Sequence, residues 1–168
     1  MRRTLDALYD GCAWLAAVAM IGVLVMVLLS VLGRQLAFHL PGTDAYAGYS
    51  MAAAGFLALA HTLKRGEHIR VTLLLGKLGG RARQGMELWS LSVAVLLAGL
   101  FAWFSVRLVL QSIEFHDIST GNDATPLWIP QLAMALGTLM LLVALLDEWV
   151  LEARGQRSHS QGQETHHE

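Results

Sequence analysis

Four long runs of this sequence contain no Asp, Glu, Lys or Arg. They are 23, 19, 19 and 23 residues long and cover residues 11–33, 45–63, 88–106 and 124–146. An α-helix needs about 20 apolar residues to cross about 30 Å of hydrocarbon. Because the runs take up half of the 168 residues, little sequence remains for a water-soluble core. The sequence therefore predicts an all-α integral membrane protein with four transmembrane helices.

The four helices are expected at about residues 11–33, 45–63, 82–112 and 128–148. They form a single transmembrane domain of residues 1–154. The third extends beyond its uncharged run because Arg107 can reach the interface by snorkelling. The fourth begins near Pro126 or Pro130, since proline fits a first helical turn and breaks a helix interior.

The first run exceeds a signal-peptide core and is read as a retained helix. Residues 155–168 are polar and are predicted to form a disordered cytoplasmic tail.

Lys and Arg are distributed unevenly between the segments outside the helices. Ten lie in the amino-terminal segment, the second connection and the tail, whereas the other two connections hold only Arg34 and Arg107. Cytoplasmic loops of membrane proteins carry the excess of Lys and Arg. Both termini and the second connection are therefore expected in the cytoplasm. The net charge of −1 hides this asymmetry.

The second connection has a pattern of its own, because residues 64–83 hold six of the twelve Lys and Arg residues. Apolar residues recur there at helical spacing, and Arg70, Lys77 and Arg81 fall together on another face. An apolar stripe beside a basic one is typical of a short helix lying among lipid headgroups. We predict such an amphipathic interfacial helix at about residues 69–78. The alternative is an ordinary cytoplasmic turn.

The second run differs from the other three, because ten of its nineteen residues are Ala, Gly or Ser. Gly48, Ala52 and Gly55 fall on one face at helical spacing. Lipid gives no hydrophobic drive for helix association, so close approach through small residues is a main source of packing energy. This face is expected to pack on a neighbour, in a partner subunit or within the chain. The alternative is an ordinary Ala-rich helix of a four-helix unit.

The four runs contain almost no ionisable residue that would support chemistry inside a membrane. His61 is the only titratable side chain in them other than cysteine and tyrosine, and it lies within three residues of Lys64. A membrane enzyme or pump is expected to carry such residues in mid-membrane. We therefore predict no catalytic, cofactor-binding or metal-binding residue. The alternative is a cytochrome b-like anchor subunit of a redox enzyme, although no helix carries two histidines buried at well-separated depths.

Several short motifs follow one another along the chain. Arg34 follows the first helix, Pro41-Gly42-Thr43-Asp44 precedes the second, and Pro126-Leu127-Trp128 precedes the fourth. The most specific motif, Arg65-Gly66-Glu67-His68-Ile69-Arg70-Val71, follows the second helix. In this order and spacing, up to about Trp149, the chain resembles the small permease subunit, DctQ type, of the tripartite ATP-independent periplasmic (TRAP) transporters.

The chain departs from this family's pattern at two points. Asp44 is followed by Ala45, where family members often carry an acidic pair with a nearby Trp. Thr72 occupies the position of the acidic residue that commonly follows His-Ile-x-Val.

Gly66 and His68 are expected to have structural roles. The glycine turns the chain at the helix exit, and the histidine forms a hydrogen bond with the backbone or with a lipid phosphate.

The resemblance implies a non-catalytic, multi-pass subunit of the bacterial inner membrane. Its expected partners are a large permease subunit (DctM type), a periplasmic substrate-binding protein (DctP type) and membrane lipids, with no nucleic acid. In such systems the binding protein delivers the substrate, often an organic acid anion, and the large subunit carries the substrate and Na⁺ sites. The small subunit is thus expected to hold no cofactor and to bind and steady the large one during Na⁺-driven uptake.

Overall fold

The computed structural model describes residues 2–38, 40–64, 80–121 and 123–154. Four α-helices follow one another in this part of the chain: α1 (Arg2–Gln35), α2 (Thr43–Lys64), α4 (Gly80–Glu114) and α5 (Trp128–Ala153). The described residues form no strand, apart from one isolated bridge between Ile118 and Pro126. The predicted all-α class is therefore confirmed for these residues.

Three of the four helices are long and apolar enough to cross a membrane: α1 over Ala7–Gln35, α4 over Gln84–Glu114 and α5 over Trp128–Ala153. α2 is not among them, because Tyr, Gly, Ser and Thr residues dilute the apolar side chains along its 22 residues. By length and composition, the described chain has the helices of a membrane protein. A membrane crossing by α2 stays a prediction.

The helices extend beyond the uncharged runs of the sequence. The apolar span of α1 holds 29 residues, which at 1.5 Å per residue gives about 43 Å. A bilayer is about 40–45 Å thick when its headgroup regions are included. The length of this span of α1 therefore matches the full thickness of a bilayer, with Asp10 and Arg34 near its two ends. α5 likewise continues past Asp147, to Ala153.

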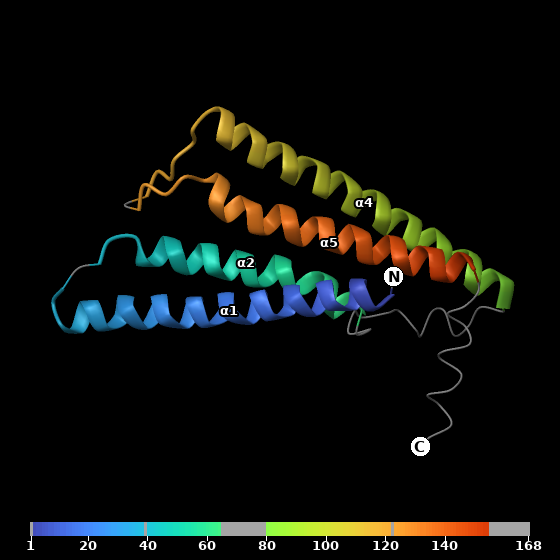
Figure 1. The fold of residues 1–168 in the computed structure, drawn as a ribbon, viewed down its shortest axis with the longest axis horizontal. Helices are drawn as coiled ribbons and strands as arrows, with labels where there is room; N and C mark the ends of the chain where they lie inside the picture. Colours follow the sequence, from blue (N-terminus) through green and yellow to red (C-terminus); the bar gives the residue numbers. More distant parts are fainter. Residues whose placement is uncertain (1, 39, 65–79, 122, 155–168) are drawn as a thin grey trace, which may run out of the picture.

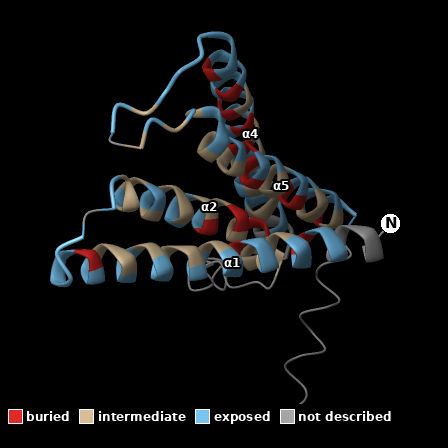
Figure 2. Ribbon diagram, turned by 60° about the vertical axis from the view of Figure 1, so that its left-hand side comes forward, coloured by how far each residue is buried: buried red, intermediate tan, exposed pale blue. Residues whose placement is uncertain are grey.

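The helices pack side by side in the order α1, α2, α5, α4 (Figure 1). α2 and α5 are the inner pair, while α1 lies along α2 and α4 lies along α5. Buried residues gather where α2 meets α5 and on α4, whereas much of α1 is exposed (Figure 2). Many exposed side chains of the outer helices are large and apolar, among them Trp14, Leu24, Trp89 and Trp103. Such surfaces suit contact with lipid tails, which are as apolar as leucine.

Small residues allow the closest approaches between helices. A Cβ atom at Gly137 of α5 would lie only 2.4 Å from the carbonyl oxygen of Phe56 of α2, so only glycine fits there. The buried residues in the carboxyl-terminal half of α4, which packs on α5, recur at spacings of four and three: Ala98, Ala102, Ser105, Val109 and Ser112. Close backbone contact of this kind is a main source of packing energy between helices in lipid.

The start of α5 follows from its prolines. Trp128 is its first residue, so Pro126 precedes the helix and Pro130 lies in the first turn. The first N–H groups of an α-helix have no acceptor within the helix, so the missing N–H of proline loses no hydrogen bond there.

Two segments that carry predictions lie outside the described residues. They are residues 65–79, which include the expected interfacial helix at 69–78, and the tail 155–168. Below, the Lys64 end denotes the end of the bundle at Lys64. The Asp123 end is the opposite one, with the connections 36–42 and 115–127.

Candidate functional site

α2 presents a face of small residues that no other described helix covers. Gly48, Ala52 and Gly55 are all exposed, and a Cβ atom at either glycine would have no described atom within 4 Å. The other sides of α2 contact its neighbours, with Ser50 against α1 and Phe56 against α5. We call Gly48, Ala52 and Gly55 the small-residue face. It is a free surface on an inner helix.

Gly137, which brings α5 against α2, is not among the residues predicted from the sequence. Ala133 and Gly137 stand four positions apart, which is the small-xxx-small spacing of close helix pairs. That signal was available in the fourth run. It is weaker than in the second run, because Leu and Met fill many of the neighbouring positions.

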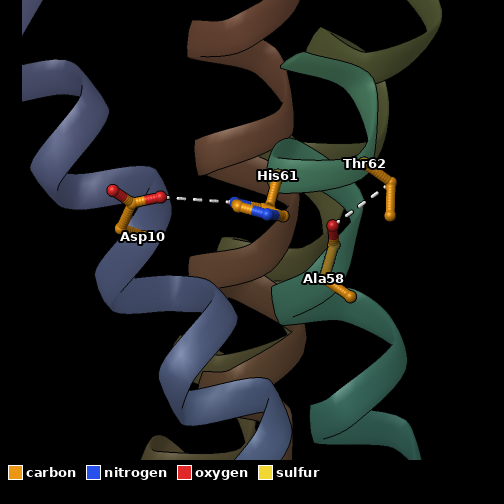
Figure 3. A network of polar contacts seen from close by, with 4 residues as sticks. All are labelled: Asp10, Ala58, His61 and Thr62. Atoms are coloured by element: carbon orange, nitrogen blue, oxygen red, sulfur yellow. Dashed lines mark hydrogen bonds and ion pairs between the residues drawn. The ribbon is translucent and has the colours of Figure 1, made fainter. Parts of the chain in front are cut away.

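At the Lys64 end, polar side chains from three helices face one another. Lys64 Nζ on α2 lies 2.8 Å from Asp147 Oδ2 on α5 and 5.3 Å from the centre of the Tyr9 ring on α1. His61 Nδ1 lies 3.6 Å from Asp10 Oδ1 across the gap between α2 and α1 (Figure 3). These contacts hold together the amino end of α1 and the carboxyl ends of α2 and α5.

The two ionic contacts at this end differ in strength. The side chains of Lys64 and Asp147 are each 24% exposed, so water screens their attraction only in part. The Asp10 side chain is 70% exposed, and its contact with His61 is ionic only when the imidazole is protonated. The Lys64–Asp147 pair is therefore the main polar clasp between the two inner helices.

At the Asp123 end, the connection between α4 and α5 folds back onto α2. Ser119 Oγ donates to Asp123 Oδ1 at 2.8 Å, and the Tyr49 hydroxyl donates to Asp123 Oδ2 at 3.0 Å. The pKa of Asp123 is lowered from 3.8 to about 2, because hydrogen-bond donors favour the charged carboxylate. The hydrogen bond from Ser119 has the largest effect on this pKa, and those from Thr125 and Tyr49 add to it. Thr125 Oγ1 also donates to the Tyr46 hydroxyl at 3.1 Å. The connection is thus tied to the first turns of α2.

Gly42 is needed where the connection between α1 and α2 passes beside Asp123. Its φ of +83° is in the left-handed region, and a Cβ atom there would lie 2.9 Å from Asp123 Cβ. Glycine adopts this conformation without a steric penalty. Asp44, two residues later, accepts a hydrogen bond from Ser30 Oγ at 3.1 Å. The Pro41-Gly42-Thr43-Asp44 motif therefore has a structural basis in the turn from α1 to α2.

The structure brings the predicted motif residues of the Asp123 end together in two pairs. Arg34, in the last turn of α1, and Asp44, in the first turn of α2, line one hollow of about 660 Å³. Pro126 and Trp128 line another hollow of about 400 Å³.

The remaining predicted residues belong to the basic tract. Six of them lie outside the described ranges: Gly66, His68, Ile69, Arg70, Val71 and Lys77. Arg81 lies within α4, but its side chain is not among those that the structure describes.

The polar groups described above act between helices. Among the residues that the structure describes, no group of three or more His, Cys, Asp or Glu side chains is placed to hold a metal ion. The clasp at the Lys64 end and the tied connection at the Asp123 end position the small-residue face between them. The small-residue face is therefore a surface on which another helix can pack.

A comparison with known protein families gives a match to the DctQ component of the tripartite ATP-independent periplasmic transporters, over residues 23–155. The match covers 133 of the 168 residues. The chain belongs to the DctQ family. It is thus a small permease subunit of a TRAP transporter, and the resemblance seen in the sequence is confirmed. No curated protein matches the chain.

The DctQ match includes the parts of the structure described above. It begins within α1 and ends just after α5, so it contains the small-residue face, the Lys64–Asp147 clasp and the Asp123 connection. The match also favours the transporter prediction over the cytochrome b-like alternative. The chain is therefore a component of a membrane transporter.

Proposed function

We propose that this DctQ chain is a non-catalytic subunit that binds the large permease subunit, of DctM type, and steadies it in the bacterial inner membrane. In this proposal all four helices cross the membrane, both termini and the Lys64 end face the cytoplasm, and the Asp123 end faces the periplasm. The large subunit carries the substrate and Na⁺ sites. It takes up a substrate, expected to be an organic acid anion, that a DctP-type binding protein delivers.

The small-residue face of α2 is the observation that carries the proposal. An exposed glycine within a helix destabilises that helix by about 1 kcal/mol relative to alanine. Lipid contact offers no compensation for this loss, whereas a partner helix that approaches closely does. Gly48 and Gly55 are both exposed on an inner helix whose remaining sides are occupied by α1 and α5. A helix of the large subunit accounts for them.

The positions of the charged groups support a role without chemistry. α2 has no Asp, Glu, Lys or Arg between Asp44 and Lys64, and α5 has none before Asp147. Ion and substrate pathways in membranes use ionisable groups that face the interior of the bundle. The described charges of these inner helices lie at their ends, where Lys64 and Asp147 hold them together. Coupling to Na⁺ is therefore assigned to the large subunit.

The distribution of Lys and Arg supports the orientation. The segments expected in the cytoplasm hold ten of these residues, and the segments expected in the periplasm hold Arg34 and Arg107. This is the bias that sets topology in multi-pass membrane proteins. Reporter fusions at each terminus and within the connection 115–127 measure it directly. A periplasmic signal from a terminus would contradict the proposed orientation.

Co-purification of the two permease subunits tests the packing on the large subunit. The substitutions Gly48→Leu and Gly55→Leu, made together, place bulky side chains on the small-residue face. We expect the amount of large subunit recovered with a tagged small subunit to fall by about tenfold, which corresponds to about 1.4 kcal/mol of lost association energy.

Gly85→Leu on α4 is the matched control, because a Cβ atom at Gly85 also has no described atom within 4 Å. It is expected to leave the complex intact. The isolated double variant should unfold at or slightly above the midpoint of the wild type, since its new side chains point into open space and leucine favours a helix over glycine. Normal recovery of the complex by the double variant would refute the proposed interface.

A further inference from the structure

A hollow at the Asp123 end is lined by side chains of opposite charge. It has a volume of about 660 Å³ and lies between the last turn of α1, with Arg34, and the first turn of α2, with Asp44. Volumes of this size are usual for small-molecule sites. No ion pair joins Arg34 to Asp44 or to another described residue. The hollow therefore offers one cation and one anion that do not neutralise each other by direct contact.

The Asp44 carboxylate is oriented by a neighbour. Ser30 Oγ on α1 donates to Asp44 Oδ1 at 3.1 Å, which leaves Oδ2 without a described hydrogen-bond donor. A carboxylate oxygen of this kind accepts readily from an ammonium group, which has three N–H donors. The Arg34 guanidinium has five N–H donors in a fork that matches the oxygens of a phosphate.

With α1 crossing the membrane as proposed above, the hollow lies at the level of lipid headgroups. The apolar span of α1 ends at Gln35, one residue after Arg34. Leu29, Phe38 and Leu40 provide apolar parts of the lining. A ligand here therefore meets charged groups and hydrocarbon together, and the lining as a whole carries no net charge. These properties fit an amphipathic molecule with a zwitterionic head.

We propose that the hollow binds the phosphate–ammonium zwitterion of a phosphoethanolamine headgroup, as part of a phospholipid in the leaflet at the Asp123 end. Arg34 binds the phosphate and Asp44 binds the ammonium. Phosphatidylglycerol has no cation for Asp44, and the quaternary ammonium of phosphatidylcholine has no N–H to donate. The site therefore prefers phosphatidylethanolamine over both.

The two charges also have a role at helix ends that does not involve a ligand. Arg34 lies at the carboxyl end of α1 and Asp44 lies at the amino end of α2, where each complements the helix dipole. If Arg34 and Asp44 only complemented the helix dipoles, the chain would not prefer one lipid over another. A measured preference for phosphatidylethanolamine therefore distinguishes headgroup binding from dipole complementation.

Native mass spectrometry of the full chain, co-purified with its large permease subunit, tests the proposal. The complex is offered an equal mixture of phosphatidylethanolamine, phosphatidylglycerol and phosphatidylcholine. The wild type is expected to retain about tenfold more phosphatidylethanolamine than either competitor. Only phosphatidylethanolamine can make the charge-assisted hydrogen bond from its ammonium group to Asp44. Arg34→Gln is expected to lose this lipid, whereas Asp44→Asn keeps phospholipid on Arg34 and loses the preference over phosphatidylglycerol.

Arg107→Gln is the matched control, since Arg107 lies on α4 and lines a different hollow. It should leave the preference unchanged. Soluble phosphoethanolamine at millimolar concentration distinguishes a lipid from a free ligand, and we expect it to displace little lipid.

Three results would overturn the proposal: equal retention of the three lipids by the wild type, unchanged retention by Arg34→Gln, or full displacement by soluble phosphoethanolamine. A preference for phosphatidylethanolamine that appears in the isolated chain and is absent from the complex would also overturn the proposal. It would mean that the large subunit, and not a lipid, occupies the hollow in the complex.

Discussion

Gly137→Ala is the substitution that tests the packing of the two inner helices most directly. The new Cβ atom would lie 2.4 Å from Phe56 O and 2.5 Å from Phe56 C, about 1 Å inside ordinary contact. Both are backbone atoms, so α2 and α5 must move apart. Overpacking of this kind costs about 1–3 kcal/mol, and a clash with backbone belongs at the upper limit. Alanine regains about 1 kcal/mol of helix propensity, which leaves a net loss of about 2 kcal/mol.

Thermal unfolding of the purified chain in detergent measures this loss. For a chain of this size, about 2 kcal/mol corresponds to a Tm lower by about 4–8 °C. Gly99→Ala on α4 is the control, because its Cβ atom would lie 3.9 Å from Leu142 Cδ1, an ordinary contact. Gly99→Ala is expected to raise Tm slightly. If both variants unfold at the same temperature, α2 and α5 are not as close as described.

Two further predictions concern the polar contacts at the two ends of the bundle. Lys64→Met leaves the Asp147 carboxylate, only 24% exposed, without its cation, and is expected to destabilise the chain by about 1–3 kcal/mol in thermal unfolding. Addition of Asp147→Leu should recover most of that loss, and a double variant as unstable as the single one would contradict the clasp. At the other end, the pKa of Asp123 is lowered to about 2, so its contribution to stability is complete above pH 3.8 and is lost as the pH falls towards 2. The Tm difference between the wild type and Asp123→Asn should therefore shrink over this range, whereas a difference independent of pH would show that the carboxylate charge is not responsible.

The sequence predicts the helical class well because long apolar runs indicate that each segment is surrounded by lipid. A lipid environment forces the backbone to satisfy its own hydrogen bonds, so long apolar runs leave little choice but helix. Helix ends are harder to predict from the same signal. The segment Arg2–Asp10 carries charge and belongs to α1 nevertheless, because headgroups and water accept charged side chains on a continuing helix.

The contacts between helices are less predictable, because they depend on which helices become neighbours. Lys64 and Asp147 are 83 residues apart, and no local pattern indicates that α2 packs against α5. Arg34 and Asp44 line one hollow because the connection between α1 and α2 reverses the chain, with positive φ at Ala37 and Gly42. The exposure of Gly48 and Gly55 likewise follows from the positions of α1 and α5 around α2.

The packing order of the helices has a consequence for biogenesis. α2 joins α1, its neighbour in sequence, but its second neighbour is α5, the last helix to be synthesised. Until the ribosome has passed Ala153, α5 is not complete and cannot fully cover the side of α2 that receives Gly137. During that interval α2, which is not among the described helices apolar enough to cross a membrane, packs mainly on α1. Translation of α5 is thus the step that commits the nascent chain to its final architecture.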